Sequence, residues 1–133
     1  MTRYLLDSNH LSAYLDRQSA LEKRIDAAMK AGDRFGICVP VHCEYRAGIR
    51  LGRRFRQNLI RLQAALQILR IWPTNESTAV EFAELTQELR AAGKAMSQFD
   101  LLIAAISRQH NLTILTADQD FRFLSSLKIE NWL

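Results

Sequence analysis

Short apolar runs alternate with amphipathic stretches along the whole chain, and this alternation limits the possible folds more than any other feature. Runs typical of buried strands occupy residues 3–6, 34–40, 68–73, 112–116 and 127–132. Helical patterns begin at about residue 10 and then cover residues 19–32, 42–52, 54–66, 77–93 and 99–110. Strands that are separated by helices require crossover connections, so the pattern predicts an α/β fold with a mostly parallel sheet.

Length and composition predict one domain, residues 1–133. A chain of 133 residues has a common domain size, and 48% hydrophobic residues can build a core. No apolar run approaches the roughly 20 residues of a membrane span, and no secretory signal pattern is present. Cys38 and Cys43 form neither a disulfide framework nor a zinc-site spacing. We therefore expect a reduced, cytoplasmic protein that does not engage a membrane.

Positive charge is concentrated in one stretch. Residues 45–75 contain seven arginines, no lysine and no acidic residue, whereas the whole chain has a formal charge of only +4. Such a stretch indicates an anionic partner, although a solvated helix face would have the same composition.

Four acidic residues are expected at the same edge of the predicted sheet. Asp7 and Asp118 each follow a strand, Glu44 comes soon after the strand 34–40, and Asp100 opens the helix that leads into strand 112–116. The carboxyl edge of a parallel sheet is where α/β proteins bind their ligands.

Each acid also has a purely structural explanation. Asp7 and Asp118 suit N-caps or turns, and Glu44 in a first helical turn would complement the helix dipole. Asp100 has capping-box spacing from Ser97, as Glu81 has from Thr78 at the start of helix 77–93. These explanations do not account for the clustering. Grouped carboxylates repel one another, and a hard divalent cation such as Mg²⁺ or Mn²⁺ would relieve the repulsion.

The motifs LLDSNHLS, VHCEYRAG, FDLLIAA and TADQDF together resemble the PIN-domain nucleases, and specifically the VapC-type toxins of bacterial toxin–antitoxin pairs. The resemblance implies a parallel sheet of four or five strands and an acidic pocket formed by Asp7, Glu44, Asp100 and Asp118. It assigns Asn9 to the support of Asp7 and makes Asp120 a possible fifth acid. Ser8 stands where many relatives have Thr and keeps the hydroxyl.

The resemblance further implies a metal-dependent endoribonuclease with Mg²⁺ or Mn²⁺ as cofactor. Asp7, Asp100 and Asp118 are the expected metal ligands, and Glu44 is expected to act through water or as the base. Arg46 and Arg50, one helical turn apart, are candidates for RNA phosphate contacts.

The expected partners are RNA and a small VapB-type antitoxin, in a homodimer or a toxin–antitoxin hetero-oligomer. The antitoxin's carboxy-terminal segment would lie across the acidic pocket and hold the toxin inactive.

Two other functions stay open at this level. One is a PIN nuclease that matures RNA without a toxin role. The other is a non-catalytic, metal-dependent α/β regulatory domain, although a receiver domain would need adjacent acids after its first strand and a late lysine, which this chain lacks. His10 and His42 flank the acidic positions without an assigned role, and His42 is expected to be a packed or exposed imidazole rather than a ligand.

Overall fold

The computed structural model describes residues 1–133 and contains one sheet of five strands, all parallel. The strand order is β3-β2-β1-β4-β5, which confirms the predicted parallel α/β architecture. The strands are β1 (Arg3–Leu6), β2 (Arg34–Cys38), β3 (Arg70–Trp72), β4 (Thr113–Leu115) and β5 (Lys128–Glu130).

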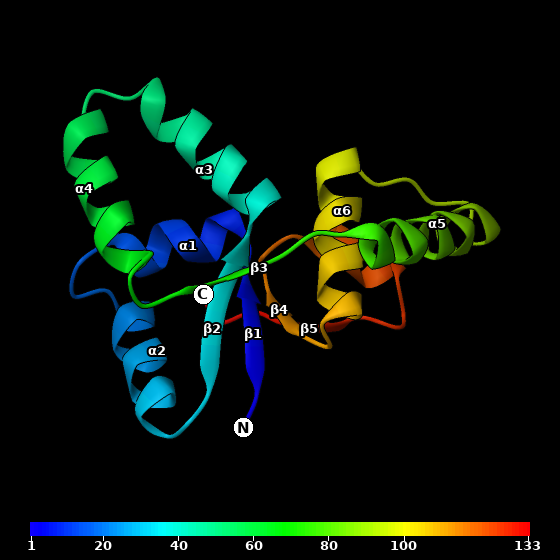
Figure 1. Cartoon of the computed structure of the whole chain (residues 1–133), viewed down its shortest axis with the longest axis horizontal. Helices are drawn as coiled ribbons and strands as arrows, with labels where there is room; N and C mark the ends of the chain where they lie inside the picture. Colours follow the sequence, from blue (N-terminus) through cyan, green and yellow to red (C-terminus); the bar gives the residue numbers. More distant parts are fainter.

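Six α-helices flank the sheet, four on one side and two on the other (Figure 1). The first group is α1 (Ser8–Leu15), α2 (Ala20–Lys30), α3 (Val39–Arg50) and α4 (Phe55–Ala65). The second group is α5 (Glu76–Ala91) and α6 (Gln98–Gln109), and a short 3₁₀ helix, η1 (Gln119–Phe123), follows β4. None of these helices is both long enough and apolar enough to span a membrane.

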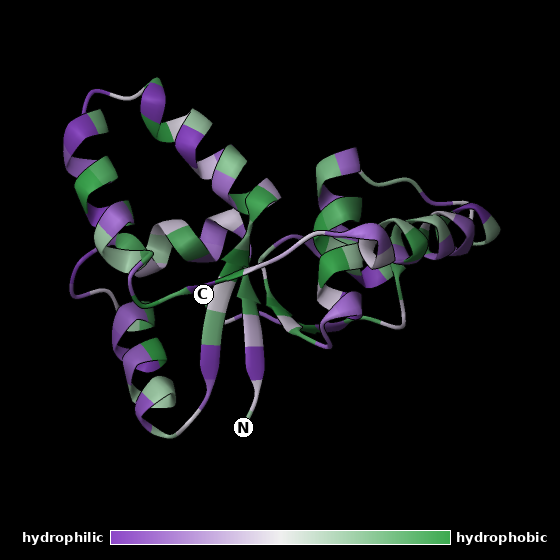
Figure 2. Cartoon of the chain, viewed as in Figure 1, coloured by the Kyte–Doolittle hydropathy of each residue, from purple (hydrophilic) through white to green (hydrophobic).

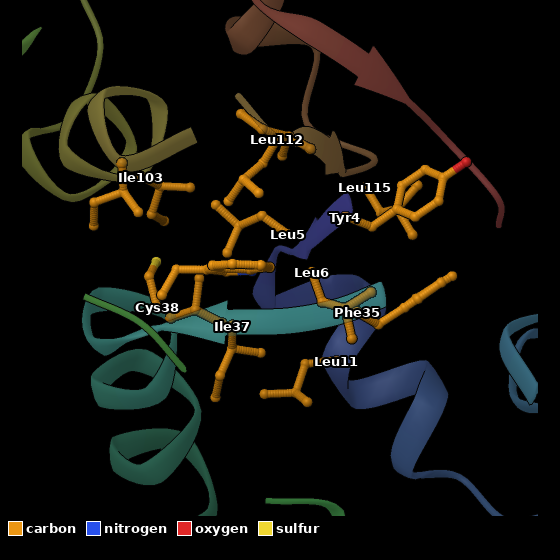
Figure 3. Close-up of a cluster of buried hydrophobic side chains, with 14 of the residues drawn as sticks. Tyr4, Leu5, Leu6, Leu11, Phe35, Ile37, Cys38, Ile103, Leu112 and Leu115 are labelled. Carbon is orange, nitrogen blue, oxygen red and sulfur yellow. The ribbon is translucent and has the colours of Figure 1, made fainter. Parts of the chain in front are cut away.

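The hydrophobic core lies on both faces of β1. Leu5 and Leu6 are completely buried, and Figure 3 shows their side chains among those of β2, α1, α6 and β4. Burial of one such side chain contributes roughly 1.5–3 kcal/mol. The helices have mixed surfaces, with apolar and polar residues interspersed along each (Figure 2), as expected for helices that cover a sheet on one face only.

A glycine allows β2 and β3 to pair closely. A Cβ atom added at Gly36 would lie 2.5 Å from the Arg70 carbonyl oxygen and 2.7 Å from Trp72 Nε1. Both distances are shorter than van der Waals contact, and one neighbour is backbone. Gly36 is therefore required by the space at this position in the sheet.

Several element boundaries differ from the sequence predictions. The sequence pattern predicts that Pro40 ends a strand, but Pro40 lies in the first turn of α3, where its missing N–H costs no hydrogen bond. Helix α1 begins at Ser8, because the Asp7 side chain caps it. Helix α5 is capped by Asn75, with Thr78 as the reciprocal partner, so the predicted Thr78–Glu81 capping box is wrong. Glu81 instead pairs with Arg108.

Candidate active site

The predicted acidic residues lie around the point where the strand order reverses. From β1 the sheet is built outward in one direction through β2 and β3, and in the other through β4 and β5. Ligands of open α/β sheets bind outside the carboxyl ends of the strands at such a point. Asp7 leaves β1 there, and Thr116 and Asp118 leave the adjacent β4.

Asp7 is held rigidly between these two strands. Its backbone N–H donates to the Leu115 carbonyl at 3.0 Å and so extends the β1–β4 ladder by one bond. Its Oδ1 accepts from the Ser8 N–H at 2.8 Å, and its Oδ2 accepts from the Thr116 hydroxyl at 2.7 Å. With only 4% of its surface exposed, the carboxylate cannot adjust without disturbing these bonds.

Thr116 is a site residue that the sequence prediction missed. Its hydroxyl donates to Asp7, and the same oxygen accepts from the Asp118 N–H at 3.0 Å. The buried Thr116 hydroxyl therefore connects Asp7 to the turn that carries Asp118. The signal in the sequence is weak, because a threonine at the end of an apolar run is also an ordinary strand residue.

Asp118 and Asp120 belong to the same turn after β4. Asp118 caps η1, and its Oδ1 accepts from the Asp120 N–H at 2.9 Å. Asp118 is half-buried, whereas Asp120 is exposed. The N-cap explanation for Asp118 is thus correct, and it places the carboxylate beside Asp7 rather than away from it.

Asp100 enters the same region from α6. It lies in the first turn of the helix, where its N–H donates to the hydroxyl of the capping residue Ser97 at 3.1 Å. Asp100 is half-buried, and its pKa is raised first by burial and then by the charges of Asp7, Asp118 and Asp120. The hydrogen bond to Ser97 thus fixes the backbone of Asp100 at the start of α6.

Glu44 approaches from α3, on the other side of Asp7. Because α3 begins at Val39, Glu44 lies in the second turn, so the explanation by the helix dipole, which acts within the first turn, does not hold. Its Oε1 is buried and has no hydrogen-bond partner. A buried carboxylate oxygen without a donor is costly, and a functional role explains why it is kept.

The pKa values of three of the acids are raised, in part by neighbouring carboxylates. The pKa of Glu44 lies above its ordinary value because of burial first, and then because of the charges of Asp7 and Asp100. The pKa of Asp100 is raised by burial and by neighbouring aspartates, against the effect of Ser97. Burial also raises the pKa of Asp7, while the hydrogen bonds from Thr116 and Ser8 oppose the rise. The structure therefore brings the predicted acids into one shared electrostatic environment.

The donor set suits a hard divalent cation, but the carboxylates do not converge on one point. No three Asp, Glu, His or Cys side chains stand close enough together to hold one ion. Mg²⁺ is commonly bound through one or two carboxylates together with water and substrate phosphates. Together with the unpartnered Glu44 oxygen, this fits an ion held largely by water. This arrangement does not bring Asp7, Asp100 and Asp118 together around one ion, so their direct ligation stays a prediction for the metal-bound protein.

The basic candidates differ from one another in their surroundings. Arg46 is exposed on α3, close enough to His42 to contribute to the lowered pKa of that imidazole, after burial. Arg50 lies farther along α3 with its guanidinium 5.0 Å from the centre of the Phe55 ring. Cys38, at the end of β2, is buried beside the acids, and burial raises the pKa of its thiol to about 12, so it is an inert core residue.

Asn9 and His10 complete the surroundings of Asp7. Asn9 is half-buried, and its Oδ1 accepts from the Ala117 N–H at 3.3 Å. His10 is completely buried, so a metal ion at the site cannot reach its imidazole. Ser8 contributes its backbone N–H to Asp7, as described above.

Comparisons with known proteins find relatives of the whole fold. The PIN domain family model matches residues 4–125. Ribonuclease VapC2 of Rickettsia felis is 26% identical over 138 residues, which cover 97% of this chain and 97% of that protein. Toxin FitB of Neisseria gonorrhoeae is 31% identical over 81 residues, which cover 61% of this chain and 55% of that protein.

Two solved structures show the same fold. In the VapBC2 structure from Rickettsia felis bound to a promoter DNA fragment, one chain superposes with a TM-score of 0.89 at 23% identity, covering 99% of this chain and 100% of that one. In the DNA-bound VapBC structure from Salmonella typhimurium the TM-score is 0.87 at 18% identity, with 100% of each chain covered. Since the family model spans nearly the whole α/β fold described above, the chain belongs to the PIN domain family.

Proposed function

We propose that this protein is a metal-dependent endoribonuclease and the toxin of a toxin–antitoxin pair that acts in the cytoplasm. The observation that carries the proposal is the group formed by Asp7, Glu44 and Asp100, whose pKa values are each raised by burial first and then by the charge of a neighbouring acid, and which form no salt bridge with a cation of the protein. The names of the relatives, Ribonuclease VapC2 and Toxin FitB, support the same activity for this chain.

The side chains have separate tasks in this mechanism. Asp7 and Asp100 would hold Mg²⁺ or Mn²⁺, with Asp118 binding directly or through water. Once bound, the ion supplies charge neutralisation at the phosphate and acidifies a water. The raised pKa of Glu44 suits a group that accepts a proton from the attacking water. Arg46 binds the substrate phosphate. The expected products carry 5′-phosphate and 3′-hydroxyl ends.

The first test is cleavage of RNA with Mn²⁺ or Mg²⁺ by Asp7→Asn and Asp100→Asn. Asn matches Asp in size and is an equally good N-cap, so Asp7→Asn should keep α1 and the fold. Loss of a ligand should lower the cleavage rate by ~10²-fold or more, because even indirect changes around a metal cost 10–100-fold.

The matched control is Asp26→Asn, which changes an exposed acid on α2. It should cleave as the wild type does, and thermal unfolding should show that all three variants remain folded. Cleavage at the wild-type rate by both site variants would rule out the assignment.

A VapB-type antitoxin is the proposed protein partner, and RNA the proposed substrate. The similar solved structures are named VapBC and FitAB, that is, as a toxin together with its antitoxin. This chain has a surface that suits a peptide segment of such a partner. Two hollows of about 170 and 220 Å³ lie along α1, α2, α3 and α4 and share Leu15 and Arg61 as lining residues. Tyr45, which follows Glu44 in the sequence of α3, lines the second hollow.

A further inference from the structure

His10 is a buried histidine whose two ring nitrogens both form hydrogen bonds. Its Nε2 is 3.0 Å from the Trp132 backbone N–H, and its Nδ1 is 2.6 Å from Asn9 Oδ1. A backbone N–H can only donate, so Nε2 must accept and carries no proton. The ring is therefore neutral, and Nδ1 bears the hydrogen that is donated to Asn9. Burial, which lowers the pKa of His10 to about 4, is consistent with this state.

This tautomer fixes the orientation of the Asn9 amide. Asn9 Oδ1 accepts two hydrogen bonds, one from His10 Nδ1 and one from the Ala117 N–H at 3.3 Å. A flipped amide would set its NH₂ group against two donors. The NH₂ group is consequently left to face away from them, and the Asn9 side chain is one of the groups that stabilise the charged form of Asp7 and so lower its pKa.

The donor to His10 is itself held in place by the packing of Trp132. The guanidinium of Arg24 lies 3.8 Å from the centre of the Trp132 ring. The rings of Tyr4 on β1 and Phe35 on β2 stand at centroid distances of 5.1 and 5.8 Å from it. A continuous set of contacts thus runs from α2 through Trp132 and His10 to Asn9.

We propose that His10 is a positioning residue for RNA cleavage, which holds the Asn9 amide so that its oxygen keeps the Ala117 N–H, and with it the turn that carries Asp118, in place beside Asp7. This inference rests on the proposed function. It differs from the simpler view that His10 only satisfies the Trp132 N–H inside the core. In that view its bond to Asn9 would have no effect on the reaction.

Two substitutions separate the two bonds. In His10→Asn the side-chain amide reaches about as far as Nδ1, so it keeps a donor for Asn9 and loses the acceptor for Trp132. In His10→Gln the amide reaches about as far as Nε2, so it keeps an acceptor for Trp132 and loses the donor for Asn9. Both variants remove the ring, and Asn, which is one methylene shorter than Gln, leaves the larger cavity.

The proposal predicts opposite effects on activity. With Mn²⁺ present, His10→Gln should lower the kcat of RNA cleavage by about 10-fold or more with little change in KM. This is the effect expected of a residue that acts on a metal site by positioning its neighbours. His10→Asn should stay within about threefold of wild type, even if it unfolds at a lower temperature. If His10→Asn loses as much kcat as His10→Gln, or more, the role is structural and the proposal is wrong.

A second measurement does not depend on activity. Ring ¹⁵N chemical shifts of the folded wild type at neutral pH should show His10 as the neutral Nδ1–H tautomer, and the Nε2–H tautomer would overturn the proposal. The Asn9 side-chain NH₂ resonances should move in His10→Gln and keep their positions in His10→Asn. If the wild type does not cleave RNA at all, the proposed function fails, while these resonances still decide whether His10 orients Asn9.

Discussion

Asp7 shows that a structural and a functional role need not compete for one residue. The same carboxylate caps α1 through the Ser8 N–H and accepts from Thr116 across the sheet. Sequence reasoning located Asp7 because a carboxylate after a buried strand is conspicuous. It could not locate Thr116, because the value of that hydroxyl comes from a partner 109 positions away in the chain.

Thr116 should control the charge of Asp7. Its hydroxyl favours the ionised carboxylate, so removing it should raise the pKa of Asp7 further above the ordinary value. In metal-free protein, Thr116→Val should shift the ¹³C titration of the Asp7 carboxyl to higher pH. The variant should also lose about 1–3 kcal/mol of stability, because the buried carboxylate loses a donor.

Thr116→Ser is the matched control, since it keeps the hydroxyl. It should titrate as wild type, and its cleavage rate should exceed that of Thr116→Val at every pH where Asp7 is only partly ionised. A Val variant with an unchanged titration would mean that burial alone sets the state of Asp7.

At the scale of single elements, the existence of each strand and α-helix was predictable, whereas the short 3₁₀ helix η1 and the element boundaries were not. Pro40 is the instructive case. It ends strands and starts helices for the same reason, its missing N–H, so a sequence pattern cannot tell which role it plays. Only the pairing of β2 with β3, which ends at Cys38 and Trp72, decides that α3 begins at Val39.

Helix α3 should bind RNA mainly through Arg46. Arg46 is exposed and lies two residues after Glu44, whereas the guanidinium of Arg50 is already placed over Phe55. Arg46→Ala should weaken RNA binding and reduce its salt dependence, by a slope of roughly 0.7 for each single-strand phosphate that the protein no longer neutralises. Arg50→Ala should have a smaller effect.

Arg90→Ala provides the control for general charge, because Arg90 is exposed in the last turn of α5. It should leave the slope of log affinity against log salt unchanged. Equal slopes for Arg46→Ala and Arg90→Ala would show that the arginines of α3 form a solvated face and do not bind phosphate.

At the scale of the whole molecule, the parallel sheet followed from the alternation of strands and helices, but the strand order did not. The order depends on pairings such as Leu5 with Gly36 and Leu5 with Ile114, which join distant parts of the chain. The same limit applies to the site. The acids were found one by one in the sequence, and their mutual effects on pKa appear only when the sheet brings them together.

The proposed partner should depend on the hollows beside α4. Ile68 lines the first hollow and has 62% of its surface exposed, and none of the four site acids lines that hollow. Ile68→Asp should greatly reduce co-purification with the product of a neighbouring small gene, because a charge there would oppose an apolar segment, and it should leave RNA cleavage by the isolated protein unchanged.

Val80→Asp on α5 is the control, with 59% exposure on the other side of the sheet. It should retain the partner. A partner that binds both variants equally would place its contact elsewhere, and the absence of any bound product would favour the RNA-maturation nuclease over the toxin.

Asp7 follows the middle strand of the sheet. β1 is hydrogen-bonded to β2 on one side and to β4 on the other, and its residues Leu5 and Leu6 are completely buried. In such strands, amide hydrogen exchange requires nearly global opening, whereas outer helices and turns open at little cost. We expect local unfolding at the periphery to leave Asp7 in place, whereas opening of α3, α6 or the turn after β4 would displace Glu44, Asp100 or Asp118. Fluctuations well short of complete unfolding would therefore interrupt the site without moving its central acid.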